Sequence, residues 1–167
     1  MTDGILERPR RLTHDIDRSG FTSGADDLDI WFHKYAWQNQ TRHNCVVYVT
    51  LHEGAVMGYY ALAAASVRAD ETDPVFAKHR PDPIPCILLA RLAVDRRAQG
   101  QNVGAALLAD AITRVVAAAG TIGAAGLLIH CRDQRAKEFY QHLTPAIEST
   151  VSPLQLVIPL HALETGH

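Results

Sequence analysis

The chain has 167 residues and a formal net charge of −2 at pH 7; 47% of the residues are hydrophobic and 20% are charged. These values are typical of an ordinary globular protein and predict one domain over residues 1–167. The net charge argues against a uniformly basic surface for nucleic acid but leaves a local basic patch open. Residues 1–11 hold no apolar segment of signal-peptide length, and the longest apolar run, residues 59–65, is too short to cross a bilayer, so we expect a cytoplasmic protein.

The N-terminal segment is expected to hold one short strand and one helix. Residues 1–20 are polar and irregular, with an edge strand around residues 11–16. Ser23 is a candidate N-cap, and Asp26, three positions later, completes a capping box. Apolar side chains then recur at helical spacing as far as residue 39, which predicts one amphipathic helix whose aromatic residues face the core.

A hairpin and a proline-rich loop follow. Residues 45–51 and 56–67 are apolar and β-branched and are separated by a turn at residues 52–54, which predicts two antiparallel strands. Residues 68–85 contain four prolines, a density that excludes a central strand and a long helix. A loop of this length is usually functional or disordered, and it brings the cations of Arg68, Lys78 and Arg80 next to the following strand.

The central feature is the stretch LLARLAVDRRAQGQNVGAALL, residues 88–108. An apolar strand at residues 87–94 leads through a basic, glycine-containing turn at residues 95–102 into a helix from Val103, which Gly120 is expected to end. The first N–H groups of a helix have no intrahelical acceptor and lie at the positive end of its dipole, so this junction is suited to binding a phosphate. Arg96 and Arg97 add positive charge there.

The C-terminal third is expected to alternate strand, helix and strand. Residues 124–131 form a buried strand, Asp133 caps a helix over residues 134–142, and residues 154–160 form the last strand. The predicted order is β, α, β, β, β, α, β, α, β, which is mixed α/β with parallel pairing around residues 87–131.

The cysteines and histidines do not indicate a metal site. Cys45, Cys86 and Cys131 are widely separated and each lies in a strand-like segment, which favours buried free thiols. A catalytic cysteine stays open, although none has an obvious local partner. The nine histidines are scattered without ligand spacing.

Two motifs resemble those of the GNAT N-acetyltransferase superfamily. Residues 97–104, RAQGQNVG, resemble its Arg/Gln-x-x-Gly-x-Gly/Ala signature, and residues 90–95 look like its central strand. Residues 135–140, RAKEFY, look like its Ala-x-x-Phe-Tyr helix. Asn102 stands where the signature prefers Gly or Ala, but Asn tolerates a positive φ and can cap a helix. The Gly-Phe often found after the tyrosine helix is replaced by Leu-Thr-Pro at residues 143–145.

The resemblance implies a fold, a cofactor and a set of site residues. The fold is the GNAT acyl-CoA N-acyltransferase fold, a mixed central sheet of about six strands flanked by helices. The co-substrate is acetyl-CoA, without a metal, and Tyr140 is the general acid that protonates the leaving thiolate. A main-chain N–H near Val94 is suited to the thioester carbonyl. The implied cofactor contacts are Leu92, Ala93, Val94, Arg97, Gln99, Gly100, Gln101, Asn102, Val103, Gly104, Ala136 and Phe139.

A narrower resemblance, from about residue 20 to 160, is to the TacT-type GNAT toxins of type II toxin–antitoxin modules. It is carried by FTSG at residues 21–24 with LDIW at 28–31, by GYYAL at 58–62, and by PIP at 83–85 leading into LARLAVD at 89–95. That family acetylates the α-amine of aminoacyl-tRNA and so inhibits translation. The resemblance also implies a cognate antitoxin, usually a ribbon-helix-helix protein, and a homodimer.

This substrate is chemically consistent with the residues present. Esterification lowers the pKa of the amine below about 8, so no strong base is needed. We interpret Glu53, Asp95 and Glu138 as surface charges rather than as the base. Arg91 lies inside an apolar strand and must point into a cleft or pair with an acid. The candidate tRNA-binding patch consists of Lys34, Arg42, Arg68, Lys78, Arg80 and Arg91.

Two alternatives remain open at this point. The same mechanism would serve a small amine or a protein N-terminus, in which case turnover needs no RNA. A non-catalytic acyl-CoA-binding or partner-binding module would result if Asn102 had spoiled the pyrophosphate site.

Overall fold

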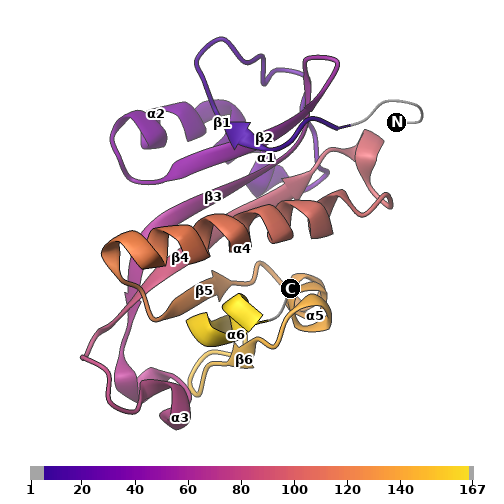
Figure 1. Ribbon diagram of the computed structural model, residues 1–167. Coiled ribbons are helices and arrows are strands. Elements are labelled where there is room, and N and C mark those ends of the chain that lie inside the picture. Colours follow the sequence, from indigo (N-terminus) through magenta and orange to yellow (C-terminus); the bar gives the residue numbers. More distant parts are fainter. Residues whose placement is uncertain (1–5, 166–167) are drawn as a thin grey trace. The chain divides into compact units, whose positions relative to one another are not determined.

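The computed structural model describes residues 6–165 (Figure 1). In this range seven strands are hydrogen-bonded in the order β1-β2-β3-β4-β5-β7-β6. The strands are β1 (Arg10–Arg11), β2 (Val46–His52), β3 (Ala55–Val67), β4 (Ile84–Val94), β5 (Gly126–His130), β6 (Ile147–Glu148) and β7 (Gln155–Pro159). The α-helices are α1 (Asp26–Lys34), α2 (Ala36–Thr41), α3 (Pro74–Ala77), α4 (Val103–Ile122), α5 (Gln134–Leu143) and α6 (Leu160–Thr165), and the 3₁₀ helices are η1 (Ala69–Glu71) and η2 (Arg96–Ala98). The mixed α/β prediction is confirmed.

The described chain divides into two compact units. The first unit comprises residues 6–63 and 90–111, and the second comprises residues 64–89 and 112–165. β3, β4 and α4 each contribute residues to both. The single domain expected from the sequence stays a prediction.

In the first unit, the predicted hairpin is confirmed. β2 and β3 pair antiparallel from Val46↔Leu62 to His52↔Ala55. The turn between them places Glu53 at φ 49° and Gly54 at φ 81°, the left-handed conformation that two-residue hairpin turns require. The expected edge strand at residues 11–16 is shorter than predicted and begins one residue earlier, since β1 comprises Arg10–Arg11; Leu12 N also donates to Val47 O of β2.

The predicted first helix is wrong in two respects. It is interrupted at Tyr35, so that α1 and α2 are separate helices. The N-cap is Ala25, without a side-chain hydrogen bond, because the Ser23 hydroxyl instead donates to Asp29 Oδ1 at 2.6 Å. The expected burial of the aromatic residues holds for Phe32, which stacks on Tyr59 with ring centroids 4.3 Å apart, but is wrong for Tyr35, which is 47% exposed.

In the second unit, the predicted parallel pairing is confirmed. β4 and β5 pair in parallel at Ile87↔Leu127 through Leu89↔Ile129, and β7 pairs antiparallel with β5. The Asp133 cap of α5 is also confirmed, since its carboxylate accepts the Ala136 N–H at 2.8 Å. β6 and α6 were not predicted.

The boundaries of the loop and of the long helix differ from the prediction. Residues 68–85 contain η1 and α3, and β4 begins at Ile84 rather than at residue 87, with Pro85 exposed inside the strand. α4 continues past Gly120 to Ile122 and is followed by Gly123 at φ 98°, whose N–H donates to Ala119 O. The glycine that ends the helix is therefore the one that adopts the left-handed conformation.

α4 is the one helix in the described range that is long and apolar enough to cross a membrane by length and composition alone. Its buried residues recur at helical spacing, as in a helix that packs into a protein core. They include Val103, Leu107, Leu108, Ala111, Val115 and Ala119.

Gly126 on β5 lies close to the main chain of β7, and this contact can be tested by substitution. A Cβ at this position would lie against the carbonyl oxygen of Ile158 on β7, well inside van der Waals contact. We expect Gly126→Ala to lower the free energy of unfolding by about 1–3 kcal/mol, because the paired strands must move apart. Urea unfolding followed by circular dichroism measures the change.

Gly120→Ala is the matched control. This glycine is in α4, and a Cβ there meets nothing within 4 Å. Alanine should leave the stability unchanged or raise it by up to about 1 kcal/mol. Equal midpoints for Gly126→Ala and the wild type would contradict the assigned close approach.

Candidate functional site

The turn between β4 and α4 presents a row of main-chain donors. We call residues 95–104 the phosphate turn. Gly100 has φ 78° and Asn102 has φ 62°, so Asn102 adopts the left-handed conformation anticipated for it. Among the contacts within residues 6–165, no protein acceptor is recorded for the N–H groups of residues 100–104. These donors lie at the positive end of α4, a 20-residue helix, and are suited to a diphosphate.

Asp95 anchors this turn from beneath. Its side chain is fully buried, with 0% exposure, so its interpretation as a surface charge is wrong. The carboxylate accepts the main-chain N–H groups of Thr22 at 3.0 Å and of Arg97 at 2.9 Å. It also accepts Arg97 Nε at 2.8 Å and Nη2 at 3.1 Å. Burial alone would raise the pKa of Asp95, but the hydrogen bonds from Arg97 and Thr22 outweigh it and lower the pKa below 3.8.

Two side chains expected to contact the cofactor have partners within the protein instead. The Arg97 guanidinium is held by Asp95, which raises its pKa, although about half of the side chain is exposed. Gln99 Nε2 donates to the carbonyl oxygens of Ser23 at 2.8 Å and Val94 at 2.9 Å. Both side chains stabilise the turn, and their roles as cofactor contacts stay predictions.

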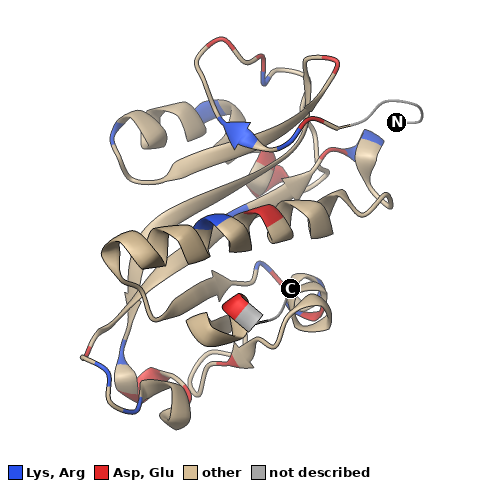
Figure 2. Cartoon of the chain, viewed as in Figure 1, with Lys and Arg blue, Asp and Glu red and all other residues tan. Residues whose placement is uncertain are grey.

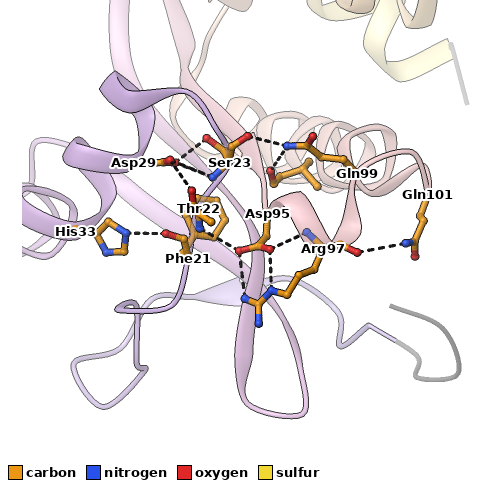
Figure 3. Close-up of polar contacts among 10 residues, drawn as sticks. Phe21, Thr22, Ser23, Asp29, His33, Asp95, Arg97, Gln99 and Gln101 are labelled. Atoms are coloured by element: carbon orange, nitrogen blue, oxygen red, sulfur yellow. Dashed lines mark hydrogen bonds and ion pairs between the residues drawn. The ribbon is translucent and has the colours of Figure 1, made fainter.

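A second segment packs against the phosphate turn (Figure 3). We call residues 22–24 the linking segment. Arg96 N donates to Thr22 O at 2.9 Å, and Thr22 N donates to Asp95, so the two segments exchange main-chain contacts. Gly24 has φ 92°, and a Cβ there would lie 3.0 Å from Arg96 Nε, so the guanidinium rests against this glycine.

α1 holds the linking segment from its other side. The Asp29 carboxylate accepts the Ser23 N–H at 3.0 Å and the Gly24 N–H at 3.3 Å. His33 Nε2 lies 2.7 Å from Phe21 O, which requires a proton on that nitrogen. Sequence reasoning missed Asp29 and His33, because their partners are loop carbonyl and amide groups that side-chain periodicity does not reveal.

Arg91 is half-buried, and no acidic partner is recorded for it among residues 6–165. Its guanidinium lies over the Trp31 ring, 4.7 Å from the centroid, so a cation–π contact stabilises the charge for which the sequence predicted a cleft or an acid. Trp31 stacks on Tyr59 at 5.9 Å, and Tyr59 Oη donates to Leu28 O. α1 therefore carries the aromatic surface on which Arg91 rests.

Tyr140 belongs to the second unit. Its side chain on α5 is only 6% exposed and packs edge-on against Phe139 at 5.1 Å. Burial first, and then the neighbouring Cys131, raise its pKa above the usual 10.0. Within the described residues, no hydrogen-bond partner is recorded for its hydroxyl.

The candidate tRNA-binding cations are placed as follows. In the first unit, Lys34 and Arg42 are exposed. In the second unit, Arg68 pairs with Asp70 at 3.0 Å, and Arg80 Nε donates to Phe76 O at 2.8 Å. Lys78 is exposed, and Figure 2 shows charges of both signs spread along the chain. A joint basic patch stays a prediction.

The cysteines are free thiols, as expected. Cys86 and Cys131 are buried and Cys45 is half-buried. Burial raises the pKa of both Cys86 and Cys131 to about 11, so these thiols are neutral near pH 7 and poor nucleophiles. No group of at least three potential metal ligands occurs in the part of the chain that the structure describes.

The buried Asp95 gives a prediction about stability. Asp95→Asn should lower the free energy of unfolding near pH 7 by about 2–3 kcal/mol, because the Arg97 and Thr22 donors lose a charged acceptor. A lowered pKa in the folded state stabilises the fold above the unfolded value and is lost as the pH falls through the folded value. The difference between wild type and variant should therefore shrink below about pH 4.

Urea unfolding near pH 7 and below about pH 4 measures this difference. The control is Glu138→Gln, which removes an exposed carboxylate on α5. A gap that persists unchanged in acid, or no gap near neutrality, would refute the role given to Asp95.

Comparison with known proteins gives consistent matches. Residues 43–143 match the family model described as an acetyltransferase (GNAT) domain. A tRNA-acetylating toxin of Mycobacterium tuberculosis is 41% identical over 150 residues, which are 90% of this chain and 90% of the toxin.

Two solved structures share the fold. AtaT complexed with acetyl-methionyl-tRNAfMet superposes with a TM-score of 0.87 at 27% identity, covering 96% of this chain and 98% of that one. An AtaT mutant with tyrosine replaced by phenylalanine, bound to the C-terminus of the antitoxin AtaR and to acetyl-CoA, has a TM-score of 0.81 at 28% identity, covering 96% of both chains.

Proposed function

Because this chain belongs to the GNAT family of acetyltransferases, which use acetyl-CoA, we propose that its acceptor is the α-amine of aminoacyl-tRNA. Acetylation of that amine would block peptide-bond formation, so the protein would act as a translation-inhibiting toxin. The observation that carries this substrate is the 41% identity to a tRNA-acetylating toxin across 90% of both chains.

The phosphate turn has the chemistry that the diphosphate of acetyl-CoA needs. The N–H groups of residues 100–104 are main-chain donors without recorded protein acceptors in the described range. Gly100 leaves open space where a Cβ would stand. Asn102 keeps the turn conformation at φ 62°, which argues against the alternative that this residue has spoiled the site. When bound, acetyl-CoA supplies the thioester whose acetyl group is transferred.

We assign Tyr140 the role of proton donor to the thiolate that leaves during direct transfer. Its side chain is buried, and its raised pKa keeps it protonated at any physiological pH. Phe139 packs edge-on against this ring, and Ala136 begins the same helical face. The main chain of β4 near Val94 is the proposed donor to the thioester carbonyl.

The acceptor amine needs little help from the protein. An α-amino group has a pKa of about 8, and esterification of the neighbouring carboxyl lowers it further. A substantial neutral fraction is then present near pH 7, so loss of the second amine proton through water suffices. Asp95 is excluded as a base because its carboxylate is fully buried and fully hydrogen-bonded.

The proposal includes partners and location. The tRNA backbone would contact Lys34, Arg42 and Arg91 in the first unit and Arg68, Lys78 and Arg80 in the second, with phosphates supplying the complementary charge. A cognate antitoxin, of ribbon-helix-helix type, would neutralise the protein, which would act as a cytoplasmic homodimer. AtaT in complex with the AtaR C-terminus supports the antitoxin part of this proposal.

The acceptor is tested with radiolabelled acetyl-CoA and bulk aminoacyl-tRNA. We expect label on charged tRNA, and none on the same RNA after deacylation. Tyr140→Phe should lower the turnover number by about a hundredfold or more, because the proton donor is removed. Tyr35→Phe is the control, since Tyr35 is an exposed tyrosine in the first unit with no proposed catalytic role.

Acetylation of free amino acids or peptides, without acetylation of charged tRNA, would show that the acceptor is a small amine or a protein N-terminus. A near-normal turnover number for a folded Tyr140→Phe protein would show that Tyr140 is not the general acid.

The raised pKa of Tyr140 predicts the shape of the pH profile. From about pH 6 to about pH 9 the turnover number should rise as the amine loses its proton and then level off. No alkaline decline is expected in this range, because a phenol with a raised pKa keeps its proton to higher pH. Short incubations keep the ester intact. A decline near pH 8 that is absent from Tyr140→Phe would show that the phenol ionises within the range.

A further inference from the structure

The first unit contains a continuous chain of hydrogen bonds from the phosphate turn to α1. Asp95 and Gln99 hold the linking segment from the turn, through Thr22 N at 3.0 Å and Ser23 O at 2.8 Å. Asp29 holds the same segment from α1 (Figure 3). The main chain of the linking segment is therefore hydrogen-bonded to the phosphate turn on one side and to α1 on the other.

Asp29 makes the contacts between α1 and the linking segment. Its two carboxylate oxygens accept the Ser23 N–H at 3.0 and 3.1 Å and the Ser23 hydroxyl at 2.6 Å. Oδ2 also accepts the Gly24 N–H and the Thr22 hydroxyl, both at 3.3 Å. Four donor groups from three consecutive residues therefore converge on this one carboxylate. The other acids at the start of α1, Asp26 and Asp27, are exposed.

α1 in turn carries residues assigned to the acceptor. Lys34 is on α1, and Trp31 on the same helix lies beneath the Arg91 guanidinium at 4.7 Å. A shift of α1 would therefore move two of the proposed tRNA contacts together, because Trp31 supports Arg91 and Lys34 is three residues farther along the helix.

We propose that Asp29 is a positioning residue that couples the phosphate turn to α1, so that acetyl-CoA binding at the turn orders the part of the tRNA site formed by Lys34 and Arg91. A diphosphate bound to the main-chain donors of residues 100–104 fixes the turn. The turn fixes the linking segment through Asp95 and Gln99, and the segment fixes α1 through Asp29. Binding of the two substrates is then cooperative in the thermodynamic sense, and tRNA binds better after the cofactor. This inference rests on the proposed function.

The test compares Asp29→Asn with Asp26→Asn. Both changes remove one negative charge from α1 near its N-terminus, but Asp26 makes none of the contacts to the linking segment. Asparagine at position 29 keeps the size of the side chain and replaces one acceptor oxygen by a donor that faces other donors. Thermal unfolding checks that both variants are folded. If Asp29→Asn is not, Ser23→Ala, which removes only the hydroxyl contact, takes its place and should weaken the coupling in part.

The first readout is amide hydrogen exchange with and without coenzyme A, which needs no RNA and no turnover. In the wild type and in Asp26→Asn, coenzyme A should protect both the peptide over residues 95–105 and the peptide over residues 22–34. In Asp29→Asn, protection of residues 95–105 should remain and protection of residues 22–34 should disappear. A merely structural role for Asp29 would change exchange in the free protein but not its response to coenzyme A.

The second readout is the affinity for uncharged tRNA with and without coenzyme A. We expect coenzyme A to tighten tRNA binding by about 5-fold or more in the wild type and in Asp26→Asn, and by close to nothing in Asp29→Asn. At saturating acetyl-CoA, the KM for aminoacyl-tRNA should rise in Asp29→Asn, whereas the affinity for coenzyme A measured without RNA should stay within about twofold of the wild type.

The outcomes separate this inference from the proposed function. Protection of residues 95–105 without protection of residues 22–34 in the wild type, or wild-type protection in Asp29→Asn, would overturn the coupling and leave the cofactor site intact. Protection in neither segment would refute the cofactor site and the coupling together. Coupled protection without any acetylation of tRNA would uphold the hydrogen-bonded link to α1 and refute both the acceptor and the ordering of a tRNA site.

Discussion

A single buried carboxylate, that of Asp95, organises the first unit. It joins the end of β4 to the linking segment by accepting main-chain N–H groups from Thr22 and Arg97, residues on different segments. A buried negative charge is tolerated only when it is fully hydrogen-bonded, and here the Arg97 guanidinium completes the set. Asp95 therefore stabilises the shape of the phosphate turn, together with Arg97 and Gln99.

One charged side chain of the phosphate turn stabilises the fold: Arg97 pairs with the buried Asp95. Arg97 would be the obvious partner for a diphosphate by sequence, yet its guanidinium neutralises Asp95. Main-chain donors at the start of α4 are the proposed phosphate-binding groups, and they need no side-chain ordering when a ligand binds. In the second unit, burial raises the pKa of the Tyr140 phenol, which is therefore neutral near pH 7.

Features set by neighbouring residues were predictable from the sequence. The hairpin at Glu53 and Gly54, the Asp133 cap of α5 and the left-handed Asn102 each depend on residues within a few positions, so local chemistry decides them. The buried stripe of α4 follows from its spacing in the same way. The glycine-turn motif at residues 97–104 and the tyrosine-helix motif at residues 135–140 together resemble one superfamily, and this combination allowed the fold to be predicted as well.

Features set by distant partners were not predictable. Asp95 looks like a surface acid because its partner Thr22 is 73 residues away in the sequence. Ser23 looks like a helix cap, but the Asp29 carboxylate competes for its hydroxyl and the helix begins two residues later than the capping box requires. Arg91 was expected to point into a cleft or to pair with an acid, whereas the face of the Trp31 ring stabilises it. In each case a tertiary contact outweighed the local preference.

The account depends on the main-chain amides of the phosphate turn binding the diphosphate of the coenzyme. Titration of ¹⁵N-labelled protein with coenzyme A, followed by amide chemical shifts, tests this most directly. The account predicts that the signals of residues 100–104 move farthest and saturate at one equivalent of ligand. Saturable shifts elsewhere in the chain, with these five amides unmoved, would contradict it.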